Sequence, residues 1–498
     1  MLDQDFIKSA LIRHNYFPYQ RKNAEELPPV FSSEELADDL IEKILALSYK
    51  RKSRGYDSIC YRATRFNNIS RPITIPHLKP YFDLVDVIAR NWEKFHSIEK
   101  NPKSIIRPRE HDDGRIIVMD YETTSEKIET RLHNSFGTKY VVHSDIKNFY
   151  PSIYSHSIPW ALIGIEEAKE KRNPNFWFNQ IDQKVRRTNR CETNGIPIGP
   201  ATSNIIAEII LSKIDEKLQS KYERHIRYVD DYTSFHETKE SAENFIIDLE
   251  NYLAEYKLII SINKTEIVEQ PTSLSPNWLS DLSLRMPKGK DINQSDALRF
   301  LDYANEIRSQ YPDGSVIKYA VKSIASRLDV NAEATFIDYL LNISVKYPIV
   351  LPFIETILSQ RPIWMNQERK NKIKVLLQEH IKYNRHDIVC WLLFYVIKYK
   401  IRLNEALKRA VVDMNDCLSS YLLFLKYPDL EYLAERINQI VESGDEYKLD
   451  NNWLLIYEAF RNDFIENPYK DGVFEIMKEA DVKFHSEENL TEGVIKLG

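Results

Sequence analysis

Glycine and cysteine are scarce in this chain. Only 12 of the 498 residues are glycine, which excludes collagen-like and linker-rich chains. The four cysteines, Cys60, Cys191, Cys390 and Cys417, form no CxxC pair, which argues against a zinc site. We therefore expect four buried thiols in a reducing compartment.

The sequence also lacks any segment that would direct it to a membrane. No run of about 18 apolar residues occurs, so no membrane span is predicted. The first ten residues, MLDQDFIKSA, carry an acid at position 3 and no apolar core, so no signal peptide is predicted. We expect a cytoplasmic protein with no membrane partner.

An excess of positive charge is missing as well. The net charge is −6, with 29% charged and 43% hydrophobic residues, a balance typical of globular proteins. Because duplex-binding proteins are usually basic, any contact with nucleic acid has to come from local basic stretches. Four such stretches precede residue 191: residues 50–54; Arg62, Arg65 and Arg71; Arg107, Arg109 and Arg115; and residues 184–190.

Hydrophobic periodicity divides the chain into two kinds of structure. The middle of the chain alternates strand, helix, strand, helix and strand, whereas helical steps dominate after about Pro287. The predicted strands are 139–146, the two arms of a hairpin over 226–235, and 258–262, and the predicted helices lie near 206–218 and 245–256.

Three short segments of the middle region combine acids and glycine in a set order. HSDIKNFYPSIY, residues 143–154, places Asp145 at the end of a buried strand. NGIPIGPATSN, residues 194–204, is a loop that opens a helix, and RYVDDYTSF, residues 227–235, puts Asp230-Asp231 at a hairpin tip. A single segment of this kind predicts only a strand-end cap or a polar turn. Three in this order predict one shared site.

Acids at the ends of adjacent strands suit nucleotidyl transfer. Phosphoryl transfer from a nucleoside triphosphate needs positioning and charge neutralisation more than covalent help. Two Mg²⁺ ions about 3.5–4 Å apart supply both, one at the attacking hydroxyl and one at the leaving group. Mg²⁺ prefers a few carboxylates together with phosphates and water. The sequence therefore predicts a two-metal site on Asp145, Asp230 and Asp231.

The three segments resemble the A, B and C motifs of reverse transcriptases. The whole chain resembles, more closely, the abortive-infection (Abi) group of bacterial phage-defence reverse transcriptases, with motifs matched over about residues 55–270. The resemblance implies that Asp145, Asp230 and Asp231 are catalytic and that these three and Ile146 are metal ligands. It also implies two Mg²⁺ ions, with Mn²⁺ as an alternative, dNTPs as substrates, and the bacterial cytoplasm as location.

This resemblance also predicts the fold class of the mixed strand–helix region and of the helical region that follows it. We expect an α+β reverse-transcriptase fingers and palm, followed by a large all-α domain that resembles helical repeats. The expected divisions are 1–138 for the N-terminal and fingers region, 139–287 for the palm, and 288–498 for the all-α domain. A length of 498 residues agrees with about three lobes.

Further site residues follow from the same resemblance. Tyr150 lies where the family has its sugar gate, with Phe149 as the alternative. An aromatic ring there would clash with a 2′-OH, although both rings could instead belong to the core. Lys264 lies where the D motif carries a lysine that can protonate the departing pyrophosphate. Gly199, Arg107 and Arg115 are expected to bind substrate, the two arginines as charge partners of the triphosphate.

Two departures distinguish the chain from templated reverse transcriptases. Motif B reads Pro197-Ile198-Gly199 where these enzymes usually have Pro-Gln-Gly, and no small basic thumb module follows the palm. Both departures agree with the Abi group. The resemblance to that group implies DNA synthesis without a template, assembly as homo-oligomers, and linkage of single-stranded DNA to the protein. The 29 tyrosines permit such a link without selecting one residue.

Two alternatives remain open from the sequence. One is a conventional RNA-templated reverse transcriptase of retron or group II intron type, which would need a thumb and a motif B glutamine. The other is a catalytically silent palm kept as a binding scaffold, against which the intact set of three acids argues.

Overall fold

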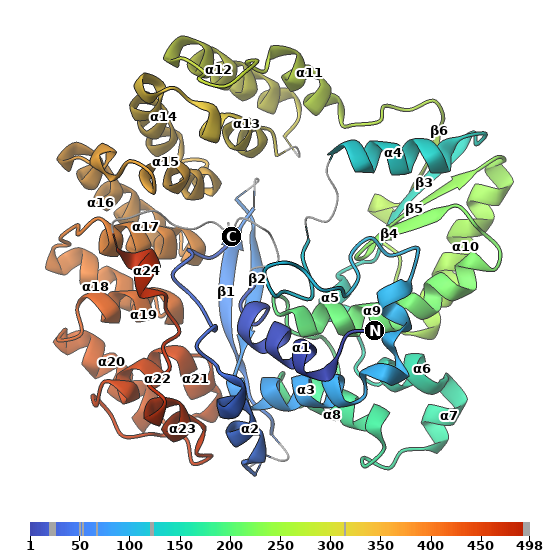
Figure 1. Ribbon diagram of the computed structural model, residues 1–498, viewed down its shortest axis with the longest axis horizontal. Coiled ribbons are helices and arrows are strands. Elements are labelled where there is room, and N and C mark those ends of the chain that lie inside the picture. Colours follow the sequence, from blue (N-terminus) through green and yellow to red (C-terminus); the bar gives the residue numbers. More distant parts are fainter. Residues whose placement is uncertain are drawn as a thin grey trace.

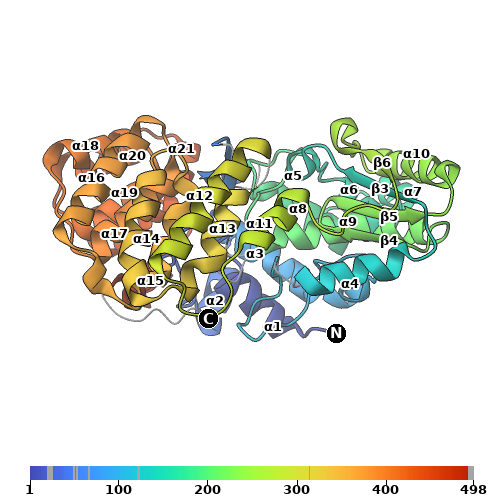
Figure 2. The same cartoon turned by 90° about the horizontal axis from the view of Figure 1, so that it is seen from above.

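The computed structural model describes residues 1–18, 26–48, 51, 54–65, 68–119, 124–312 and 315–491. The palm, with its antiparallel sheet, forms one end of the molecule and an arc of helices forms the other (Figures 1 and 2). The N-terminal helices and a two-stranded hairpin lie between these two ends. Within the described residues, no helix has the combination of length and apolar character that crossing a membrane requires.

The N-terminal region builds the fingers around an antiparallel hairpin. β1 pairs with β2 from Ser58–Pro76 to Thr64–Ser70, and within the described residues no further strand joins this ribbon. The elements of this region are α1 (Gln4–Ser9), α2 (Asp38–Ala46), β1 (Ser58–Thr64), β2 (Ser70–Pro76), α3 (Leu78–Arg90) and α4 (Thr124–Ser135), with a π-helix over Ala10–His14 and 3-10 helices over Trp92–Lys94 and His96–Lys100.

The palm sheet has four antiparallel strands in the order β4-β5-β3-β6. Val141 and Val142 of β3 are fully buried, and α10 packs against β3, β5 and α9. The elements are β3 (Tyr140–Asp145), α5 (Phe149–Ser152), α6 (Ser157–Ile163), α7 (Ile165–Glu170), α8 (Trp177–Arg187), α9 (Ala201–Gln219), β4 (His225–Tyr228), β5 (Asp231–His236), α10 (Lys239–Glu255), a 3-10 helix over Ile262–Lys264, and β6 (Glu266–Glu269).

One predicted strand of the palm is wrong. Over 258–262 the structure has only an isolated bridge between Ile146 and Ile260, and the strand that pairs with β3 on the side away from β5 is β6. Ile259 is 62% and Ile262 83% exposed. Leu258 and Ile260 of the same run are buried, so the apolar run is only partly covered beside the end of β3, and the more polar β6 is the sheet edge.

Helices make up the rest of the chain. They are α11 (Asn277–Arg285), α12 (Gln294–Gln310), α13 (Val316–Ile324), α14 (Val330–Ile343), α15 (Glu355–Leu358), α16 (Gln367–Lys382), α17 (His386–Lys398), α18 (Glu405–Asp413), α19 (Cys417–Lys426), α20 (Glu431–Glu442), α21 (Glu446–Asp450), α22 (Trp453–Arg461), α23 (Val473–Glu479) and α24 (Glu487–Leu490), with 3-10 helices over Ala325–Arg327, Pro348–Ile354 and Pro362–Trp364.

These helices stack in two rows. One row runs through α12, α14, α16, α18, α20 and α22, and a second runs through α17, α19 and α22, where successive members contact one another. Figure 1 shows the resulting arc around the fingers. This arrangement confirms the predicted α+β region followed by a helical region. The division at residue 287 stays a prediction.

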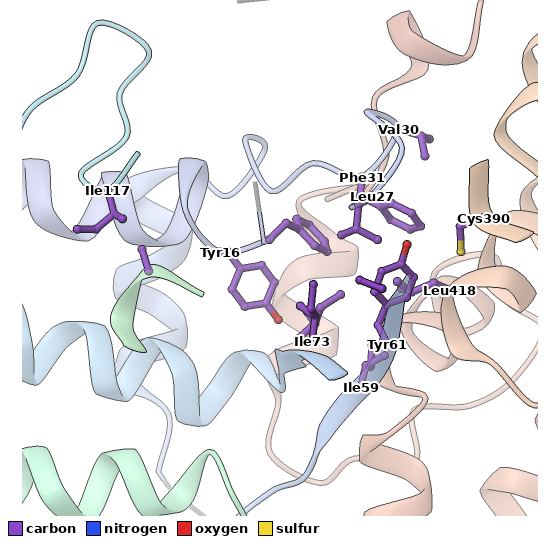
Figure 3. Close-up of a cluster of buried hydrophobic side chains, with 14 of the residues drawn as sticks. Tyr16, Leu27, Val30, Phe31, Ile59, Tyr61, Ile73, Ile117, Cys390 and Leu418 are labelled. Atoms are coloured by element: carbon purple, nitrogen blue, oxygen red, sulfur yellow. The ribbon is translucent and has the colours of Figure 1, made fainter. Parts of the chain in front are cut away.

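One hydrophobic core joins the fingers to the helical region. Figure 3 shows Ile59 and Tyr61 of β1 in the same cluster as Cys390 of α17 and Leu418 of α19. Cys390 and Cys417 are buried as expected, but Cys60 is exposed and Cys191 partly exposed. Side chains alternate along a strand, so Cys60, between two buried neighbours, faces away from this core. The prediction of four buried thiols is therefore wrong for two of them.

Candidate active site

The palm sheet brings the three acids of the sequence motifs together. Asp145 is the last residue of β3 and lies directly opposite Asp231, the first residue of β5. Asp230 precedes Asp231 in the tight turn from β4, where Val229 has a left-handed φ of +57°. Antiparallel pairing therefore places the carboxyl groups of Asp145 and Asp231, 86 residues apart in sequence, at one edge of the sheet.

A buried arginine supports this turn from beneath. Arg227 is fully buried and pairs with Glu208 at 2.8 Å and with Asp215 at 2.7 Å. Its Nη1 also donates to the carbonyl of Val229 at 2.8 Å. Because Val229 immediately precedes Asp230, this hydrogen bond helps to fix the backbone that carries the second acid.

A cleft of about 720 Å³ opens above the acids. It lies between the palm and the fingers hairpin. The lining includes the four predicted catalytic residues and the gate candidates, together with residues of β2 and of the connection between β1 and β2: Arg65, Ile69, Ser70, Arg71, Pro72, Ile73, Asp145, Ile146, Phe149, Tyr150, Ile198, Gly199, Asn204, Asp230, Asp231 and Lys264.

Crowding of like charges shapes the electrostatics of the cleft. Burial raises the pKa of Asp230, and the nearby charge of Asp145 raises it further. The pKa of Asp231 rises to about 7, first through loss of water around the carboxyl and then through a hydrogen bond with Asp145. Lys264 offsets this charge, because its Nζ lies 2.6 Å from Oδ2 of Asp145. That contact is also the largest cause of the raised pKa of Lys264.

The donor chemistry of the three acids fits a hard divalent cation. Their mutual repulsion favours a positive charge between them, and carboxylate oxygens are ligands that Mg²⁺ prefers. In the described part of the chain, no three His, Cys, Asp or Glu side chains are grouped closely as ligands. The cation now in contact with Asp145 is the ammonium of Lys264.

The gate candidates lie on the floor of this cleft. Phe149 and Tyr150 begin α5, are 3% and 9% exposed, and have ring centroids 5.1 Å apart. The amide of Asn204 donates to the Tyr150 hydroxyl at 3.1 Å. Burial, together with the charge of Asp230, raises the pKa of Tyr150. The Tyr150 hydroxyl is therefore protonated at neutral pH, and its position is tied to α9.

Gly199 lies where motif B meets the fingers. The amide of Thr74 on β2 donates to the carbonyl of Ile198 at 2.7 Å. A Cβ on Gly199 would lie 2.8 Å from Cγ2 of Ile73 and 3.0 Å from the carbonyl oxygen of Thr74. Glycine is thus required for the close approach of these two segments.

The two arginines expected at the triphosphate do not line the cleft. Arg115 is buried and pairs with Asp113, and Arg107 donates to the carbonyl of Asn101 at 2.9 Å. The last basic stretch is likewise neutralised, with ion pairs from Lys184 to Asp83, Arg186 to Asp182 and Arg190 to Asp57.

Two arginines of another basic stretch do line the cleft. Arg65 follows β1 and Arg71 lies in β2, both facing the acids. Within the described residues, neither has an ion pair. The charge of Asp230 acts on Arg65, and that of Arg71 acts on Asp230. The sequence signal was the basic run itself, but only the fold separates free arginines from those already paired.

Comparison with known proteins places these motifs in a family domain. Residues 83–303 match the family model described as reverse transcriptase (RNA-dependent DNA polymerase). No curated protein matches the chain.

Three solved structures of Candida tropicalis telomerase are similar at low TM-score. The telomerase in complex with the TWJ fragment of telomeric RNA has 12% identity and a TM-score of 0.33, over 74% of this chain and 68% of that one. The apo telomerase has 11% identity and a TM-score of 0.32, over 81% and 72%. The apo form truncated from its C-terminal domain has 13% identity and a TM-score of 0.32, over 48% and 56%.

The matched residues 83–303 include Asp145, Asp230 and Asp231. The chain therefore contains a reverse transcriptase domain, with its motif acids gathered in one cleft.

Proposed function

We propose that this protein is a DNA polymerase that transfers dNMP from dNTPs by two-metal catalysis. The observation that carries the proposal is the convergence of Asp145, Asp230 and Asp231 in one cleft of a reverse transcriptase domain. The same cleft holds cations and an aromatic floor, as a nucleoside triphosphate requires. Its volume of about 720 Å³ is in the range of small-molecule sites.

Each part of the cleft has a role in this reaction. The carboxylates of Asp145, Asp230 and Asp231, with the main-chain carbonyl of Ile146, would hold Mg²⁺ or Mn²⁺. The metal supplies charge neutralisation at the transferred phosphoryl group. Lys264 keeps an ammonium beside Asp145 and would give a proton to the departing pyrophosphate.

Substrate contacts divide between the fingers and the palm. Arg65 and Arg71 are the cleft's candidates for the triphosphate, in place of Arg107 and Arg115, since guanidinium groups bind phosphate oxygens well. Tyr150, with Phe149 as the alternative, would exclude a 2′-OH and so select dNTPs.

The direct test is incorporation of labelled dNTPs with Mg²⁺ by the purified protein. The parent should form polymer, and Asp230→Ala should abolish it without unfolding the protein, because this change relieves like-charge repulsion. Glu240→Ala, an exposed acid on α10, is the matched control and should keep full activity. Full activity in Asp230→Ala would overturn the assignment of the three acids. No polymer from the parent with any template would overturn the proposal and leave a catalytically silent palm.

We further propose that synthesis needs no template and that the chain is a phage-defence enzyme of the Abi group. Support comes from motif B, where the apolar Ile198 lines the cleft at a position usually taken by glutamine. Equal incorporation with and without added RNA would support this proposal. Strict dependence on RNA would instead favour a conventional templated reverse transcriptase.

Priming by the protein itself is the last part of this proposal. An attacking hydroxyl has to lie within about 3–3.5 Å of the α-phosphate, and a tyrosine side chain can supply it. In a boiled denaturing gel, label should stay with the protein and shift on nuclease treatment. Label released as free DNA by heat and detergent alone would rule it out. Assembly as a homo-oligomer, implied by the same resemblance, is checked by light scattering of the purified protein.

A further inference from the structure

The fingers hairpin is held at the point where it reaches the cleft. Asp387, in the first turn of α17, accepts hydrogen bonds from the Thr64 amide at 2.6 Å and from the Thr64 hydroxyl at 2.8 Å. Thr64 is the last residue of β1, and the next residue, Arg65, lines the cleft above the acids. The Asp387 carboxylate, 323 residues away in sequence, therefore fixes the position of Thr64. Thr64 immediately precedes Arg65, a cation of the cleft lining.

The hairpin depends on such contacts for its position. A two-stranded ribbon is marginally stable alone, and β1 and β2 join no larger sheet within the described residues. On the palm side β2 is bound through the Thr74 amide. On the opposite side β1 packs against α17, as the cluster of Figure 3 shows. Near the hairpin turn, the side-chain amide of Asn68 donates to the carbonyl of Lys346 at 3.1 Å.

Asp387 is itself firmly placed. Its side chain is buried, at 4% exposure, and it sits in a helix packed on both β1 and α16. Burial raises the pKa of its carboxyl to about 6, so at a pH of about 7.5 the group is ionised and accepts both hydrogen bonds. Within the described residues no ion pair competes for it. The buried charge is met by hydrogen bonds, two of them from Thr64.

We infer that Asp387 is a positioning residue for Arg65, through which the helical domain takes part in nucleotide binding. By fixing the backbone and hydroxyl of Thr64, Asp387 sets where the neighbouring guanidinium reaches over the acids. The helical domain is then a component of the substrate site and not only an appended scaffold. This inference rests on the proposed function, because it assigns Arg65 to the triphosphate.

A double-mutant cycle between positions 387 and 65 tests this inference in the full-length protein. Asp387→Asn should raise the KM for dNTP about fivefold, with kcat changed less than about twofold, since it weakens the hold on a binding residue alone. In an Arg65→Ala background the same change should leave KM unaltered. Thr64→Val, which removes only the hydroxyl, should reproduce part of the effect. Glu405→Gln, an exposed acid in the first turn of α18, is the matched control.

Additive effects of the two changes would overturn the inference, because a merely structural role of Asp387 does not depend on Arg65. If Asp387→Asn does not fold, Thr64→Val with and without Arg65→Ala decides instead. If the parent incorporates no nucleotide, the proposed function fails by itself. In that case the same double-mutant cycle is measured as the affinity for inorganic triphosphate by calorimetry. Non-additive effects of the two changes on this affinity support the placement of Arg65 by Asp387, and additive effects refute it.

Discussion

A single buried arginine, Arg227, helps to fix the backbone of the turn that carries Asp230. Arg227→Met would leave Glu208 and Asp215 buried without their cation and would free the carbonyl of Val229. We expect the free energy of unfolding to fall by about 3–5 kcal/mol, the usual cost of breaking a buried ion pair. Arg224→Met, on an exposed neighbour, should change it by less than about 0.5 kcal/mol. Urea denaturation followed by circular dichroism measures both, and equal values would contradict this role.

We also predict that one side chain decides sugar selection. Tyr150 is the gate candidate whose hydroxyl is held by Asn204. Tyr150→Ala should open the floor of the cleft and reduce the preference for dNTPs over rNTPs about tenfold, or about 1.4 kcal/mol in differential binding. Competition between labelled dNTP and rNTP measures the ratio. An unchanged ratio would transfer the role to Phe149, for which Phe149→Ala is the matching variant.

At the scale of elements, the meeting of β2 with motif B depends on a glycine. Gly199→Ala would press a Cβ against Ile73 and the carbonyl of Thr74, at a φ of +139°. We expect a loss of about 1–3 kcal/mol in the free energy of unfolding, as in other overpacked sites. Gly137→Ala has a φ of +78° but nothing within 4 Å, so it isolates the backbone cost. A Gly199→Ala protein no less stable than Gly137→Ala would show that the two segments can separate freely.

Over the whole molecule, the fingers and the helical domain share a core. A chain ending at Pro287 would remove α17 and α19 from β1 and expose side chains such as Ile59 and Tyr61, which are 1% and 0% exposed in the full chain. We expect such a truncation to be insoluble or to bind hydrophobic dye strongly, and to be inactive. Size-exclusion chromatography and dye fluorescence measure this outcome. A truncation that stays soluble and active would contradict this expectation.

Local patterns were sufficient for much of the fold and for the acids. The strand ending in Asp145, the hairpin at Asp230-Asp231 and the helices after Pro287 were all predicted, because each depends on residue spacing within one segment. Apolar character predicted a strand wrongly over 258–262, where Ile259 and Ile262 are exposed and only an isolated bridge forms. Whether an apolar run pairs in a sheet or lies along its end is decided by neighbours that are distant in sequence.

The sequence by itself determined the chemistry available to this protein: three acids in motif order, a lysine in the D motif position, and helices in the second half. Only the tertiary structure decided which basic residues face the acids. Arg107 and Arg115 are engaged elsewhere in the structure, while Arg65 and Arg71 line the cleft. It also brought Asp387 to Thr64. Both depend on contacts between distant segments, and charge pairing and burial are properties of the folded surface that no local spacing encodes.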